Sequence, residues 1–161
     1  MTCTLRNAAT LSRDDCAILV GALGLLLPVS VGLRLVGLRR VLALVEALVS
    51  VRRRNCAADD HRRPARTAWL VEIAARWCLP RPTCLAKALV VFSLLQRRGL
   101  PVELVIGVTK AQGPLEGHAW VELGGAAIVV ADPGPARYAV LVRTPAWLPA
   151  PATMARRERA P

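Results

Sequence analysis

The segment RPTCLAKALVVFSLLQRRGLP, residues 81–101, constrains the fold most, because it indicates one buried helix with defined ends. Thr83 is placed to cap the N-terminus, and Gly99 followed by Pro101 is typical of a helix stop. Apolar residues recur with the i, i+3, i+4, i+7 spacing of a helix face: Leu85, Ala88, Leu89, Phe92 and Leu95. Further apolar residues lie around the remaining circumference, so we expect this helix to be buried on most sides.

Short strands follow the helix. Residues 102–109, VELVIGVT, alternate apolar side chains on one face. Gly124-Gly125 is a tight hairpin signal between strands at 118–123 and 126–130, and YAVLVR at 138–143 is a further candidate strand. Helices followed by strands predict an α+β fold, in which N-terminal helices precede a helix packed on an antiparallel sheet of three or four strands.

Three residues on these elements have the chemistry of a catalytic group. Cys84 opens the buried helix, His118 lies in the strand GHAWVEL, and Asp132 follows the strand AAIVV. The first turn of a helix favours an anion, and a thiol with an imidazole and a carboxylate makes a nucleophile with its base and orienting group. Each residue also fits a purely structural role: a buried cysteine, a satisfied histidine, and an aspartate in the turn former Asp-Pro-Gly-Pro.

Two features bear on whether Asp132 faces His118: the hairpin register, and fraying at the strand end, which would also turn Asp132 inward. A two-residue turn at Gly124-Gly125 pairs His118 with Ala131 and turns Asp132 to the other face. A three-residue turn that includes Ala126 places His118 opposite Asp132. Glu122 shares a strand face with His118 and remains a rival orienting carboxylate.

The other cysteines compete weakly with Cys84. Five cysteines are spaced irregularly with no CxxC pair, so neither a zinc site nor a disulfide framework is expected, and a reducing cytoplasm fits this pattern. Cys78 is the main rival, but it ends a helix and therefore lacks the helix N-terminal field. The second histidine, His61, lies in a polar run and is expected to be a solvated loop residue.

The stretch from Cys84 to Leu123 resembles the transglutaminase-like, papain-type cysteine peptidases of lasso-peptide biosynthesis, the leader peptidases called B proteins. The shared features are Cys84-Leu85 at a helix start, Arg97-Arg98-Gly99 at its end, Gly107-Val108 in a strand, and the run His118-Ala119-Trp120-Val121-Glu122. The resemblance covers about residues 65 to 140. It implies a papain-type core with Cys84 as nucleophile, His118 as base and Asp132 as orienting group.

The resemblance also implies a function. Such enzymes cut the leader from a ribosomally made lasso precursor peptide, and a partner cyclase then closes the ring. A small recognition domain, fused or separate, holds the leader. The N-terminal part of this chain is apolar helix, so we expect a stand-alone peptidase that needs a separate leader-recognition protein. Thiol chemistry of this kind needs no metal or other cofactor.

Helices are expected before the peptidase core. Residues 16–33 carry no charge and just reach the length of a membrane span, although Pro28 weakens that interpretation. Residues 36–51 form a second amphipathic pattern. We expect an apolar helical region at 1–55, the peptidase core at 65–143 and a disordered tail at 144–161. The N-terminal helices are expected to pack on the core or on a partner, with weak membrane association as the alternative.

The net charge of +11 comes almost entirely from arginine. No nucleic-acid motif accompanies it, and few aromatic residues are present to stack on bases, so no nucleic-acid partner is expected. The leading hypothesis is a cytoplasmic cysteine protease acting through a thioester. A transglutaminase-like acyltransferase and a non-enzymatic membrane-associated adaptor are the two alternatives.

Overall fold

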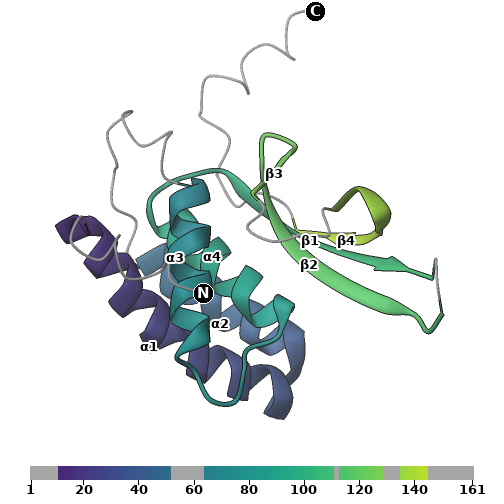
Figure 1. Cartoon of the computed structure of the whole chain (residues 1–161), viewed down its shortest axis with the longest axis horizontal. Coiled ribbons are helices and arrows are strands. Elements are labelled where there is room, and N and C mark those ends of the chain that lie inside the picture. Colours follow the sequence, from purple (N-terminus) through teal and green to yellow (C-terminus); the bar gives the residue numbers. More distant parts are fainter. Residues whose placement is uncertain (1–10, 52–63, 111–112, 129–134, 145–161) are drawn as a thin grey trace, which may run out of the picture.

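The chain folds into helices and an antiparallel sheet, which confirms the predicted α+β class. The structure is a computed structural model, and it describes residues 11–51, 64–110, 113–128 and 135–144. Figure 1 shows the helices gathered on one side of the molecule and the strands on the other. The helix α4 (Cys84–Arg97) lies between the two groups, because it contacts α1, α2 and α3 as well as β1 and β2.

The first three helices form most of the helical layer. They are α1 (Arg13–Leu35), α2 (Gly37–Val51) and α3 (Pro64–Arg76). A capping box starts α1, in which the Ser12 hydroxyl accepts from the Asp15 N–H while the Asp15 carboxylate accepts from the Ser12 N–H. The same carboxylate pairs with Arg66 at 3.2 Å, which ties the start of α1 to α3.

The predicted helix 81–101 is confirmed as α4, with the predicted ends. The Thr83 hydroxyl accepts from the Ala86 N–H at 3.2 Å, so Thr83 is the N-cap and Cys84 is the first helical residue. Gly99 adopts a φ of +79°, and the following N–H of Leu100 bonds back to the Leu95 carbonyl, as in a glycine-terminated helix. Leu89, Val90 and Leu95 are fully buried, so α4 is the centre of the core.

The sheet has the order β3-β2-β1-β4 with antiparallel pairing throughout. Its strands are β1 (Val102–Thr109), β2 (Glu116–Leu123), β3 (Ala126–Ile128) and β4 (Ala139–Arg143), and a 3-10 turn, η3 (Pro135–Arg137), precedes β4. Because β3 pairs only with 121–123 of β2, the described part of the sheet leaves the first half of β2 as an edge.

The hairpin between β2 and β3 has a two-residue turn. Leu123 pairs with Ala126, and Gly124 and Gly125 both have positive φ, at +58° and +80°. Glycine suits this turn because positive φ at both central residues strains other residues. The three-residue alternative, which would have placed Asp132 opposite His118, is therefore wrong. Asp132 itself lies outside the described residues, as does the predicted tail beyond Thr144.

One buried cluster joins the helices to the sheet. It includes Leu26 of α1, Val45 of α2, Phe92 of α4 and Val121 of β2. The predicted division between 1–55 and 65–143 stays a prediction, and the cluster contains residues from both sides of it. By length and composition α1 could cross a membrane, a test that the core helix of a soluble protein or a signal sequence also passes.

Candidate active site

Cys84 is the first residue of α4 and lines a pocket between the helices and the sheet. The Thr83 cap uses the Ala86 N–H, and the Thr83 carbonyl accepts from the Lys87 N–H. The N–H groups of Cys84 and Leu85 are the two that remain in the first turn to face a developing anion. The predicted position of the thiol at the helix start is thus confirmed, and its side chain is half-buried.

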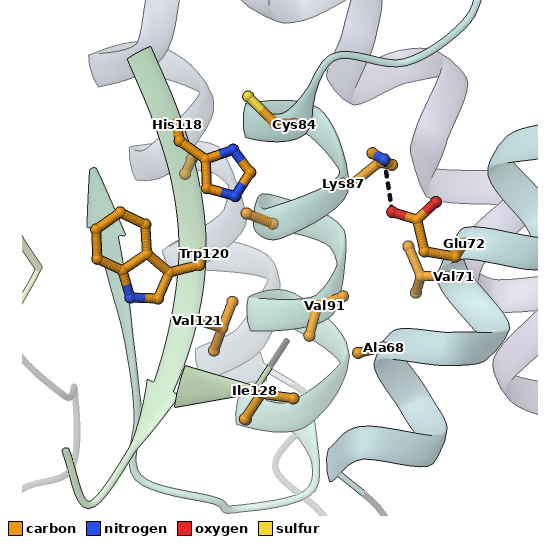
Figure 2. Close-up of a pocket in the computed structure, with 12 residues that line it drawn as sticks. Ala68, Val71, Glu72, Cys84, Lys87, Val91, His118, Trp120, Val121 and Ile128 are labelled. Atoms are coloured by element: carbon orange, nitrogen blue, oxygen red, sulfur yellow. Dashed lines mark hydrogen bonds and ion pairs between the residues drawn. The ribbon is translucent and has the colours of Figure 1, made fainter. Parts of the chain in front are cut away.

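His118 lines the same pocket as Cys84. Figure 2 shows Cys84 at the start of α4 and His118 on β2 at one end of the pocket, with Val91, Val121 and Ile128 toward the other end. Within the described part of the sheet, β3 pairs with 121–123 of β2, and His118 lies before this paired part. The structure therefore brings the predicted nucleophile and base to one cavity.

The pocket between α3, α4 and β2 is small and mostly apolar. Its cavity volume is about 90 Å³, and seven of its twelve lining residues are aliphatic: Ala68, Val71, Ala88, Val91, Ala119, Val121 and Ile128. A cavity of about 150 Å³ accommodates benzene. This pocket therefore suits a smaller group, such as an aliphatic side chain next to a reacting carbonyl.

An ion pair stands on the wall opposite His118. The Lys87 ammonium, one turn after Cys84, lies 2.5 Å from the Glu72 carboxylate of α3 (Figure 2). Burial of the imidazole, followed by the positive charges of Lys87 and Arg137, lowers the pKa of His118 below its ordinary value of 6.5. His118 is consequently neutral at neutral pH, which is the form that accepts a proton.

Aromatic rings hold the imidazole in place. The ring of His118 stacks with Tyr138 at a centroid distance of 5.1 Å and with Trp120 at 6.1 Å. Gly107 of β1 pairs with His118 and lies against this cluster, because a Cβ built there would stand 2.8 Å from the Trp120 ring and 2.9 Å from the Tyr138 Cβ. The absence of a side chain at Gly107 is what lets the indole and Tyr138 close around His118.

We expect Gly107→Ala to destabilise the protein by about 1–3 kcal/mol, because the added methyl group overpacks the ring cluster. Gly117→Ala is the matched control: Gly117 lies on the neighbouring strand, and an added Cβ there meets nothing within 4 Å. Urea denaturation of both variants measures the difference. Equal stabilities would contradict the role assigned to Gly107.

Both carboxylate oxygens of Glu122 accept hydrogen bonds from residues other than His118. Its Oε1 accepts from the Trp120 indole at 2.8 Å, and its Oε2 accepts from Arg143. Arg143 also bonds Glu103, so the carboxylate fixes the indole beside His118 and belongs to an ion-pair network. Asp132 lies outside the described residues, so its role as orienting group stays a prediction.

Cys78 lies away from this cavity. It follows the end of α3, packs in part against the main buried cluster, and is not among the residues that line the pocket. Of the other cysteines, Cys16 is exposed on α1, while Cys3 and Cys56 lie outside the described residues. Among the described cysteines, Cys84 is the one placed with His118.

Sequence reasoning missed three contributors to the site. Tyr138 stacks on His118, while Lys87 and Glu72 form the opposite wall. The spacing of Cys84 and Lys87, one helical turn apart, was the signal for the lysine. Tyr138, directly before β4, and Glu72 of α3 reach the site through tertiary packing, which no local sequence pattern predicts.

The sequence was compared with models of known protein families, with curated proteins and with solved structures. A sequence model of the Transglutaminase-like superfamily matches residues 24–143, a range that includes the second half of α1, all of α2, and every element named in the site. The match begins well before the region 65–140 on which the resemblance rested. Neither a curated protein nor a solved structure matches the chain.

Proposed function

The chain belongs to the Transglutaminase-like superfamily, and from this premise we propose that it is a cysteine-dependent enzyme that cleaves a peptide amide through a thioester on Cys84. The observation that supports it most is the single pocket shared by Cys84, at a capped helix start, and His118, whose lowered pKa keeps the ring neutral. A neutral imidazole next to a thiol is the pairing that nucleophilic cysteine catalysis uses.

The reaction would proceed in two steps. His118 takes the proton of the Cys84 thiol as sulfur attacks the amide carbonyl, and the N–H groups of Cys84 and Leu85 face the oxyanion. Collapse breaks the C–N bond, His118 gives its proton to the departing amine, and an acyl thioester remains on Cys84. Water, deprotonated by His118, then attacks the thioester, releases the acid and restores the thiol. The positive charge of Lys87, although offset by Glu72, favours the oxyanion stages.

The pH profile of such an enzyme should reflect the lowered pKa of His118. We expect kcat/KM to rise with pH along a limb whose midpoint lies below 6.5, because the base is active only when neutral. Lys87→Gln removes a charge that lowers this pKa and leaves Glu72 unpaired, so the limb should move to higher pH. The control is the other lysine, Lys110→Gln, which should leave the limb in place. A limb that Lys87→Gln does not move would contradict this assignment.

The same pKa shift affects folding stability. Since the folded state holds His118 less protonated than the unfolded state does, His118 costs no stability above about pH 6.5. Its contribution becomes unfavourable as the pH falls through 6.5 toward the lowered value. Both kcat/KM and the free energy of unfolding should therefore decrease as the pH falls below about 6.5.

We further propose that the substrate is a lasso precursor peptide, from which this enzyme releases the leader. The support is the combination of Cys84-Leu85, Arg97-Arg98-Gly99 and His118-Ala119-Trp120 that the chain shares with the lasso B proteins, together with the superfamily match. In this proposal a separate leader-recognition protein presents the precursor, and a cyclase closes the ring of the released core peptide. The reaction would take place in the cytoplasm.

The proposal is tested by intact-mass analysis of the precursor peptide encoded near this protein, incubated with the enzyme and the recognition protein. Hydrolysis gives two products whose masses sum to the precursor plus one water. A primary amine added at the concentration of the precursor separates hydrolysis from acyl transfer, because a peptidase still yields the free acid whereas an acyltransferase yields the amide. An intact precursor, with the recognition protein shown to bind it, would contradict the leader-peptidase proposal.

A further inference from the structure

One face of α1 is apolar and exposed from Val20 to Leu35. The α1 stripe consists of side chains three or four residues apart whose exposed fractions range from 44% to 77%: Val20, Leu23, Leu27, Val31 and Leu35. Monomeric proteins rarely leave so continuous an apolar surface to water, and such surfaces mark contact sites.

Arginines stand at both ends of this stripe. On a helix with 100° per residue, Arg13 and Arg34 fall within about 40° of Leu27, so both are on the exposed face. No charged residue lies between positions 16 and 33. The two arginines are about 31 Å apart along the axis, and Arg39 and Arg40 extend the exposed positive charge into α2.

The opposite face of α1 is occupied by the protein itself. Ile18, Ala22 and Leu26 are buried, and Asp15 is paired with Arg66 of α3. A membrane-spanning α1 would have to break these contacts, whereas a helix lying flat on a membrane keeps them. An apolar face with a basic rim, and with its other side covered, is the arrangement of an interfacial helix.

A hollow at the C-terminal end of the stripe adds a site for an anion. Its volume is about 330 Å³, and it is lined by two arginines, two hydroxyl-bearing residues and three leucines: Arg34, Arg81, Ser30, Thr83, Leu33, Leu38 and Leu85. Within the described part of the chain the buried Ser30 hydroxyl has no hydrogen-bond partner. Two guanidinium groups near an unsatisfied hydroxyl are a set of donors suited to phosphate oxygens.

We propose that the α1 stripe and the Arg34–Arg81 hollow form one docking surface for an anionic phospholipid membrane. The stripe enters the boundary between headgroups and acyl chains, and the hollow receives a lipid phosphate. Arg34 lies at the end of the stripe and also lines the hollow, so the two contacts are made in a single orientation. This proposal is independent of the peptide chemistry proposed above.

Co-sedimentation of the full chain with vesicles tests the proposal. Vesicles of phosphatidylcholine with phosphatidylglycerol should bind the protein, and phosphatidylcholine alone should bind it more weakly. Each basic residue near an anionic surface contributes about fivefold in affinity, so Arg34→Gln with Arg81→Gln should lower binding by about 25-fold. Leu23→Glu with Leu27→Glu should abolish it.

The controls separate membrane docking from misfolding and from self-association. Leu23 and Leu27 are exposed, so their substitution should leave the thermal midpoint unchanged. Leu141→Glu makes the same change at an exposed leucine of β4 and should not affect binding. Binding that persists in Leu23→Glu/Leu27→Glu would overturn the proposal. So would a homodimer that the stripe substitutions dissociate and that binds no vesicles, because the stripe would then be a contact between two copies.

Discussion

Cys84→Ala is expected to abolish release of the leader, with a loss on the order of 10⁶-fold in kcat, the scale seen when the nucleophile is removed from a serine protease. The reason is that alanine can form no thioester, and the pocket offers no second thiol in the described part of the chain. The substitution shortens a half-buried side chain without disturbing the Thr83 cap, so the fold should be retained. Mass spectrometry of the precursor over time measures the residual rate.

Cys78→Ala is the matched control for this experiment. It removes another half-buried cysteine only six positions away, outside the residues that line the pocket. Leader release should survive this change. Cleavage that persists in Cys84→Ala, or disappears only in Cys78→Ala, would contradict the assignment of the nucleophile.

His118→Gln is expected to lower kcat by about 10²- to 10⁴-fold, the usual contribution of a general base. Glutamine keeps a polar side chain of similar length beside Trp120 and Tyr138, but it cannot accept and return a proton during the reaction. Alkylation of Cys84 by iodoacetamide near neutral pH provides a second measurement, because loss of the base should also slow this reaction. The alkylation rate isolates the thiol from substrate binding.

The chain contains one other histidine, His61, and His61→Gln is the control. Both rates should match those of the unaltered protein. Equal alkylation rates in His118→Gln and the unaltered protein would show that His118 does not act on the thiol, and any loss of cleavage would then have a structural cause.

The helix that carries the nucleophile could be predicted because its signals are local. Thr83, Gly99 and the apolar spacing between them are all read within 20 residues, and they fix both the ends of α4 and the position of Cys84. The β-strands were predictable for the same reason, and the paired glycines gave the hairpin. Thus the fold class and two of the proposed catalytic positions followed from short-range patterns.

What could not be predicted depends on packing between distant segments. The sequence does not determine the turn length at Gly124-Gly125, because two- and three-residue hairpin turns are both common. Nothing near Tyr138 in sequence indicates that β4 pairs with β1 and brings this ring to His118. Likewise Glu122 has the right position for an orienting carboxylate, and only the structure shows that Trp120 and Arg143 occupy its oxygens.

The first turn of α4 separates two cavities, the pocket of Cys84 and His118 and the Arg34–Arg81 hollow. No residue lines both cavities. Thr83 and Leu85 line the Arg34–Arg81 hollow, while Cys84 and Lys87 line the pocket that contains His118. Neighbouring residues of one helical turn thus line two different cavities. The Thr83 hydroxyl, which caps the helix, fixes the backbone that separates these cavities. A change in either compartment that tilts this turn must move the thiol. If both proposals hold, selection for lipid binding and selection for catalysis would act on the same short segment, residues 83–87.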